Sequence, residues 1–148
     1  MVLLVSMLIF GLFLISGFLF PVRTQRYYRL RRPRYTPPGS LIGLIWMILY
    51  VMISYSYSAY FFASHPIEPH VIALMLINYF LNQAYPYIQF HLQKLWWATW
   101  DAVLLTISTL LLMISIQDYP PSSYLLIPYF CWTLFASILS YQIASLNE

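Results

Sequence analysis

One carboxylate and a few tryptophans are the residues of this apolar chain whose types could support chemistry. Asp101 is the only acidic residue inside an apolar run, and Trp97 precedes it by four residues, on the same face of a helix. A charged group at bilayer depth is costly and needs a partner or a function. Either Asp101 binds a ligand, or it caps or pairs with a neighbouring loop and orients its helix. No second carboxylate or histidine can be placed beside it, so no catalytic dyad is predicted.

A stripe of apolar residues lies near the C-terminus. Trp132, Ala136 and Leu139 are spaced i, i+4, i+7 and share one helix face, bulky at one end and small in the middle. The stripe predicts either helix packing or the wall of a site for a flat, apolar ligand. Three further tryptophans begin the preceding apolar run, where an aromatic belt at the membrane interface is the commoner explanation. They are Trp96, Trp97 and Trp100.

The composition places the chain in a membrane. Of its 148 residues 61% are hydrophobic and only 7% are charged, with a mean hydropathy of +0.72, whereas a soluble domain carries about 25% charged residues. The net charge of +3 is no sign of a nucleic-acid partner, because six of the seven basic residues lie in one loop. These are Arg23, Arg26, Arg29, Arg31, Arg32 and Arg34. Membrane lipids are the expected surroundings.

Five apolar segments are long enough to cross a bilayer, which needs about 20 residues per helix. They cover approximately residues 2–22, 39–63, 70–90, 95–116 and 122–146. Most connections are short, so successive helices should be antiparallel. The sequence therefore predicts an all-α integral membrane protein, a single domain over residues 1–148 that forms a bundle of five transmembrane helices.

The charges predict the orientation of this bundle. The loop arginines and Lys94 fall on one side, while Glu68 and Asp118 fall on the other. The basic side should face the cytosol, which places the N-terminus away from the cytosol and the C-terminus in it. Pro37 and Pro38 are expected to fix the start of the second helix, because proline is tolerated in a first turn.

Two features of the second and third helices have more than one interpretation. Polar residues surround Pro86, among them Asn82 and Gln89; they could satisfy the carbonyl that the proline frees, or they could line a cavity. Gly39 and Gly43 form a GxxxG pattern, which permits close approach of a neighbouring helix. The histidines are scattered between loops on opposite sides, so no metal site is predicted.

Three blocks of sequence carry a likeness to a known family: RRPRYTPPGSLIGLIWMILY, NQAYPYIQFHLQKLWWATWD and LLIPYFCWTLFASILSY. In these blocks, without gaps and in order, the chain resembles the translocator proteins, also called tryptophan-rich sensory proteins or peripheral-type benzodiazepine receptors. Several positions depart from the family pattern: Tyr35, Ser40 and Tyr85 replace tryptophans, Leu44 replaces a proline and Ser140 an asparagine. No basic residue follows Tyr141, as the family's sterol-recognition pattern would require.

The resemblance implies a five-helix bundle with a pocket under the first cytosolic loop, which binds protoporphyrin IX, haem, synthetic ligands and in some members sterols. By position, the ligand-binding residues would be Ile42, Trp46, Asn82, Trp97, Ala98, Asp101, Trp132, Ala136 and Leu139. Arg32, Pro37 and Pro38 would belong to the loop that gates the pocket. Tryptophan faces suit stacking on a macrocycle, and arginine suits its propionates. No cofactor is required; the porphyrin or haem is the ligand.

Three functions follow from this likeness. The first is a receptor, sensor or carrier for tetrapyrroles and related hydrophobic molecules, with no catalytic residues. The second is an enzyme that degrades porphyrin under light, with Trp97 and Trp132 as reactive groups. The third is a structural subunit of a membrane complex. The resemblance further implies a homodimer, in the outer mitochondrial membrane of a eukaryote or the cell membrane of a bacterium.

Overall fold

The computed structural model describes residues 1–21 and 28–147, and these form helices joined by loops. Arg23 and Arg26 of the predicted basic loop lie outside the described residues. The long helices are α1 (Val2–Leu19), α3 (Gly39–Phe62), α4 (Pro69–Pro86), α5 (Leu95–Ser115) and α6 (Ile127–Leu146). A π-helix, η1 (Tyr87–Leu92), continues α4, and a 3₁₀ turn, η2 (Tyr124–Leu126), precedes α6.

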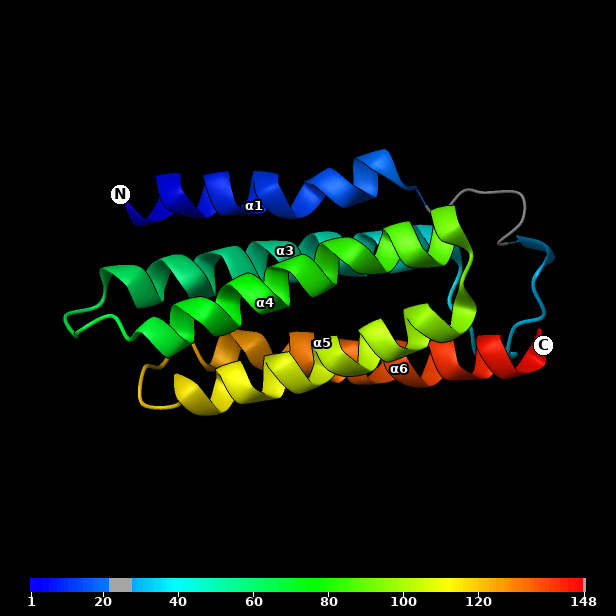
Figure 1. Cartoon of the computed structure of the whole chain (residues 1–148). Coiled ribbons are helices and arrows are strands. Elements are labelled where there is room, and N and C mark those ends of the chain that lie inside the picture. Colours follow the sequence, from blue (N-terminus) through cyan, green and yellow to red (C-terminus); the bar gives the residue numbers. More distant parts are fainter. Residues whose placement is uncertain (22–27, 148) are drawn as a thin grey trace.

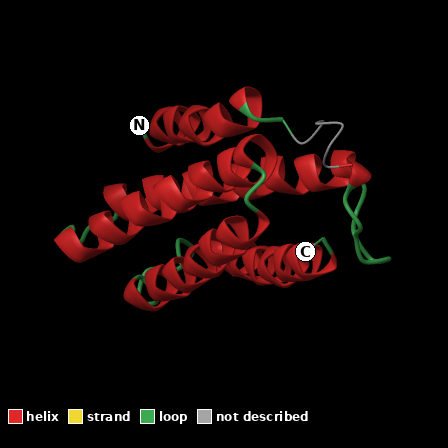
Figure 2. Ribbon diagram, turned by 45° about the vertical axis from the view of Figure 1, so that its right-hand side comes forward, coloured by secondary structure: helices red, strands yellow, loops and turns green. Residues whose placement is uncertain are grey.

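The long helices lie side by side in a bundle, with α3 behind α4 and α6 behind α5 in the view of Figure 1. Helix α1 packs on α3 and α4, and α5 packs between α4 and α6. Figure 2, turned by 45°, shows that the described chain consists of helices and the loops that connect them. Successive long helices run antiparallel, as their connections predict.

Figure 1 also shows which connections share an end of the bundle. The segment before α3, the connection between α4 and α5 and the C-terminus lie at one end, and the N-terminus and the other two connections lie at the opposite end. The described arginines between α1 and α3 therefore share an end with Lys94, whereas Glu68 and Asp118 belong to the other end.

Four helical segments of the described chain are long and apolar enough to cross a membrane: α1, α3, α5 and the η2–α6 unit. The helical class predicted from sequence is confirmed, and four of the five predicted spans meet these criteria. Helix α4 is not among them, because polar residues such as Asn78, Asn82 and Gln83 interrupt its second half and lower its mean hydropathy.

Two polar residues of α4, Asn78 and Asn82, are buried in a hydrogen-bonded network. Asn78 Oδ1 accepts from the Tyr57 and Tyr129 hydroxyls at 3.2 and 3.0 Å, and its Nδ2 donates to Ser108 and Thr109 at 2.9 and 2.8 Å. Buried polar groups are tolerated when they are partnered in this way. The network joins α3, α4, α5 and α6 in the middle of the bundle.

The start of α3 is set as the sequence predicts. Pro38 is the N-cap residue, in an extended conformation, and Gly39 is the first helical residue. The Pro38 carbonyl accepts from the backbone N–H groups of Leu41 and Ile42 at 2.9 and 3.1 Å. Proline cannot supply a side-chain cap, but its fixed φ angle directs the chain into the helix.

Apolar packing is uneven along the bundle. A large buried cluster runs through the middle of the bundle to the N-terminal end and includes Phe13, Ile53 and Leu112. At the opposite end the buried cluster is small, with Phe90, Leu139 and Ile143 as its members. The bundle is thus well filled over most of its length and less filled beneath the segment that precedes α3.

Candidate ligand cavity

A cavity of about 1170 Å³ occupies the loosely filled end of the bundle. Its walls come from the C-terminal part of α1, the segment before α3, the first half of α3, the junction of α4 with η1, and α6. Residues from all of these elements line it, among them Gly17, Phe18, Pro33, Thr36, Gly43, Tyr50, Tyr85, Phe135 and Ile143. Pockets of about 300–1,000 Å³ are usual for small-molecule ligands, so this one is large enough for a drug-sized or macrocyclic molecule.

Aromatic rings form one wall of the cavity. Trp46 of α3 and Trp132 of α6 both line it, and their ring centroids are 6.3 Å apart in an edge-to-face arrangement. Tyr50 lies one turn along α3, with its ring 5.5 Å from that of Trp46. A hydrogen bond to α4 holds this wall in place, because the Tyr50 hydroxyl donates to Asn82 Oδ1 at 3.0 Å.

Small residues explain why this part of the bundle is hollow. A Cβ atom added to Gly17 or Gly43 would meet nothing within 4 Å, and both residues line the cavity together with Ala136. The predicted role of Gly43 in close helix approach is therefore wrong, since its missing side chain leaves open space. Filling that space needs a ligand or a larger residue.

The segment before α3 covers the cavity and is fastened to α6. The Arg31 N–H donates to Asn147 Oδ1 at 2.8 Å, and Asn147 Nδ2 donates back to the Arg31 carbonyl at 2.8 Å. The Tyr35 hydroxyl bonds to Gln142 Oε1. Arg32 lies at the rim, with its guanidinium 5.6 Å from the centre of the Tyr28 ring, and both residues line the cavity.

Polar groups lie on the side of the cavity formed by α4 and η1. Asn82 is bonded through both its side-chain oxygen and its side-chain nitrogen, because its Nδ2 also donates to the Tyr129 hydroxyl at 3.1 Å. Tyr85 shares a hydrogen bond of 2.6 Å with Ser140 of α6. Gln89, in contrast, is buried with its Oε1 unpartnered among the described residues. Trp132 likewise has a buried Nε1 without a partner there.

The structure brings together most of the predicted site residues. The cavity is lined by six of the nine predicted ligand-binding residues, Ile42, Trp46, Asn82, Trp132, Ala136 and Leu139, and by the three predicted loop residues, Arg32, Pro37 and Pro38. The remaining three, Trp97, Ala98 and Asp101, are not among the lining residues. All three belong to α5, and α5 contributes nothing to the cavity wall.

Trp97 and Asp101, predicted from their spacing to lie on one helix face, differ in their exposure. Trp97 is 66% exposed on the outer surface of the bundle, whereas Asp101 is only 7% exposed. Side chains four residues apart are offset by about 40° around a helix, enough to separate an outward face from an inward one. With Trp100 also 63% exposed, this end of α5 presents its tryptophans outward, as an interfacial belt would.

Asp101 is buried where α5 packs against its neighbours. Its Oδ2 atom has no hydrogen-bond partner among the described residues, and the flanking Ala98 and Ala102 are almost completely buried. The sequence left open whether Asp101 binds a ligand or orients its helix. Its place outside the cavity lining argues against direct contact with a ligand there.

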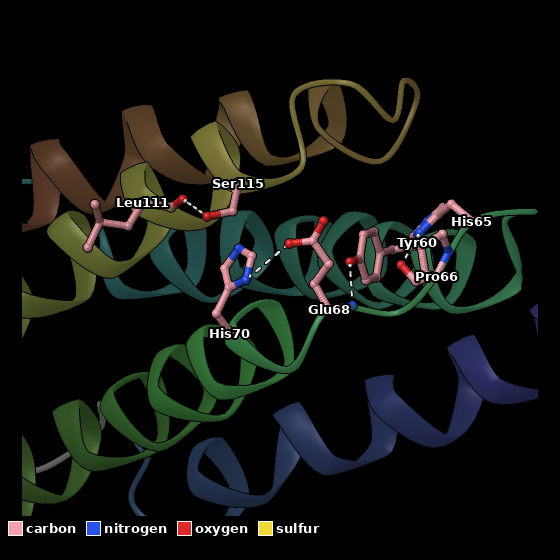
Figure 3. Close-up of polar contacts among 7 residues, drawn as sticks. All are labelled: Tyr60, His65, Pro66, Glu68, His70, Leu111 and Ser115. Atoms are coloured by element: carbon pink, nitrogen blue, oxygen red, sulfur yellow. Dashed lines mark hydrogen bonds and ion pairs between the residues drawn. The ribbon is translucent and has the colours of Figure 1, made fainter.

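The opposite end of the bundle carries a separate group of polar and aromatic residues (Figure 3). The Tyr60 hydroxyl accepts from the Glu68 N–H at 3.4 Å. The His65 ring stacks on that of Tyr119 at 3.8 Å. His70 Nδ1 lies 3.1 Å from Glu68 Oε2. Within residues 1–21 and 28–147, no three His, Cys, Asp or Glu side chains are placed to hold a metal ion.

Several lining residues were not predicted from sequence. Leu14, Gly17 and Phe18 of α1 contribute a wall, but they sit in a uniformly apolar run that gives no sign of which face turns inward. Asn82 and Gln89, the polar residues around Pro86, line the cavity, as one of their two interpretations predicts, and Tyr85 lines it as well.

Comparison with known proteins finds one matching family model and several relatives of similar sequence. The family model described as TspO/MBR family matches residues 3–146. The chain is 43% identical to the tryptophan-rich protein TspO of Bacillus cereus, over 97% of this chain and 94% of that protein. It is 41% identical to the uncharacterized membrane protein YtaB of Bacillus subtilis, with the same coverage. It is also 30% identical to the human translocator protein, over 88% of this chain and 80% of that one.

Proposed function

The chain belongs to the TspO/MBR family, and on that premise we propose that it binds a flat tetrapyrrole, such as protoporphyrin IX or haem, in the cavity. The observation that carries the proposal is the wall formed by Trp46 and Trp132, two indoles on different helices that border one large cavity. Such rings offer broad apolar faces for stacking on a macrocycle. Arg32 at the rim is positioned to bind a propionate group of the porphyrin that extends out of the cavity.

The binding proposal is tested by fluorescence quenching of the detergent-purified protein with protoporphyrin IX in the dark. We expect saturable quenching, with a dissociation constant raised about tenfold in Trp46→Ala and in Trp132→Ala, since each removes a stacking face. Trp97→Ala is the matched control, because this indole is exposed and off the cavity. An affinity that falls equally in all three variants, or quenching that never saturates, contradicts the proposal.

Light-dependent degradation of porphyrin is the second candidate function. It is favoured by the same pair, because two electron-rich indoles face the space that a porphyrin would fill. Of the two tryptophans predicted to react, only Trp132 lies on the cavity, and Trp46 takes the place of Trp97. Under illumination, loss of the porphyrin absorption band should need Trp46 and Trp132 but not Trp97. A rate unchanged in Trp46→Phe and Trp132→Phe rejects the enzymatic function and leaves binding intact.

A role as a purely structural subunit fits the molecule less well. Such a subunit has no need of a cavity of about 1170 Å³ lined by aromatic residues. A sterol would also fit a largely apolar cavity, but Tyr141 is 54% exposed and packs against Trp96 on the outside. Any sterol bound in the cavity would therefore not use the Tyr141 region.

We further propose that α4 spans the membrane as the fifth helix and that the arginine-rich end is cytosolic. Beyond Pro69 and His70 at its start, the exposed large side chains of α4 are apolar: Ile72, Leu76, Ile77 and Phe80. Its polar residues Asn78 and Asn82 are buried inside the bundle. In a Cys131→Ser background, Glu68→Cys and Lys94→Cys should react with an impermeant thiol reagent from opposite sides, with Lys94→Cys on the cytosolic side. Labelling of both from one side would contradict the five-span topology.

A further inference from the structure

Gln89 is the most unusual polar residue of the cavity. It lines the wall, its side chain is 3% exposed, and its Oε1 atom has no hydrogen-bond partner among the described residues. More than nine in ten buried polar groups in proteins are partnered, and an unpartnered one destabilises the fold. Because an unpartnered Gln89 destabilises the fold, we expect its hydrogen-bond partner to be a bound molecule.

The local backbone explains how Gln89 reaches the cavity. Pro86 has no N–H to donate within α4, and the chain after it winds as the π-helix η1. This winding buries the consecutive residues Gln89 and Phe90 on the cavity side while Tyr87 and His91 remain exposed. Single π-helical turns inside helices occur often at functional sites.

The other polar groups on this side are already engaged. Asn82 bonds to the Tyr50 and Tyr129 hydroxyls, and Tyr85 bonds to Ser140. Gln89 therefore retains hydrogen-bonding capacity where its neighbours have little. No hydrogen bond to Oε1 opposes rotation of the amide about χ3, a torsion with a broad energy profile, so the amide can turn toward a ligand.

We propose that Gln89 is a specificity-determining residue that selects ligands with a hydroxyl group on the edge that meets η1. An amide offers both an acceptor and donors, and a hydroxyl likewise donates and accepts, so the two groups satisfy each other. The edge of protoporphyrin IX carries methyl, vinyl and propionate groups and no neutral donor. This inference rests on the proposed function, because it assumes that the cavity binds flat ligands.

A matched pair of porphyrins tests the inference. Haematoporphyrin differs from protoporphyrin IX by 1-hydroxyethyl groups in place of the two vinyl groups. The ratio of the two dissociation constants is measured in the wild type and in Gln89→Leu, which replaces the amide by an apolar side chain of similar size. We expect the ratio to shift by about three- to tenfold toward protoporphyrin IX in Gln89→Leu, the loss typical of one neutral hydrogen bond. Comparing ratios cancels the different solubility of the two porphyrins.

Two controls separate this effect from a general change in the protein. Trp97→Phe should leave the ratio unchanged, because Trp97 is exposed outside the cavity. Gln89→Leu should unfold at the same or a higher temperature than the wild type without ligand, since it removes an unpartnered buried oxygen. If Gln89→Leu lowers the unfolding temperature instead, the amide has a structural partner and the inference is overturned.

A sterol arm shows whether the hydroxyl is recognised on another flat scaffold. Cholesterol and its 3-deoxy analogue are compared as competitors of protoporphyrin IX, and Gln89→Leu should weaken only cholesterol. Saturable porphyrin binding with the same ratio in wild type and Gln89→Leu overturns this inference alone. Absence of saturable binding by both porphyrins and both sterols overturns the proposed function and this inference with it.

Discussion

Replacement of Asn78 by leucine is expected to destabilise the bundle strongly without touching the cavity wall. Asn78 is fully buried, and its amide makes four hydrogen bonds to three other helices. The Ser108 and Thr109 hydroxyls keep their own bonds to the Leu105 carbonyl in the variant. The Tyr57 and Tyr129 hydroxyls lose the acceptor for their protons.

The magnitude follows from these partners. An orphaned buried donor costs about 1–3 kcal/mol, and hydrogen bonds between membrane helices average about 0.6 kcal/mol each in double-mutant cycles. The two orphaned hydroxyls belong to two of the four lost bonds, so these figures describe the same loss and are not added. We therefore expect Asn78→Leu to lower the free energy of unfolding by about 2–4 kcal/mol. Reversible unfolding in mixed micelles, followed by circular dichroism, measures this change.

A double-mutant cycle with Tyr57→Phe tests the physical reason. Asn78 is the hydrogen-bond partner of the Tyr57 hydroxyl at 3.2 Å, so Tyr57→Phe should cost less in the Asn78→Leu background than in the wild type, with a coupling energy of about 1 kcal/mol. Ser115→Ala, which loses only an exposed bond to the Leu111 carbonyl, is the matched control and should be nearly neutral (Figure 3). A destabilisation below about 1 kcal/mol, or a coupling energy of zero, would refute the account of this network.

Three further outcomes are expected at the cavity. Gly43→Ile should fold normally, since open space surrounds that position, but should weaken porphyrin binding at least about tenfold because its side chain fills the cavity; unchanged affinity would exclude this site. Asn147→Ala removes both hydrogen bonds to the Arg31 backbone and should speed trypsin cleavage of the covering segment about tenfold, whereas an unchanged rate would show that other contacts hold it. Arg32→Gln should weaken binding of protoporphyrin IX about tenfold and leave that of its dimethyl ester unchanged, because only the free propionate forms a charge-assisted hydrogen bond; equal losses for both would reject the rim contact.

The sequence alone determined the class of the protein and the place of its helices. A low content of charged residues excludes a soluble domain, and prolines and charges mark where helices end. Pro38 does cap α3, and the stripe of Trp132, Ala136 and Leu139 does share one face that borders the cavity. These features depend on local chain geometry and on the cost of moving charges into lipid, which can be evaluated residue by residue.

Only the tertiary structure decided which faces turn inward. In a helix of a soluble protein the polar face marks the outside. In lipid the outer and inner faces of a helix can both be apolar, so the helical period shows which residues share a face but not whether that face points into the bundle. For this reason Trp97 could not be told from Trp46, although one faces outward and the other lines the cavity. The same limit applies to Gly43, whose open surroundings depend on where α1 and α6 lie. The unpartnered amide of Gln89 is likewise a property of the assembled bundle, because partners from other helices decide whether a polar group is satisfied.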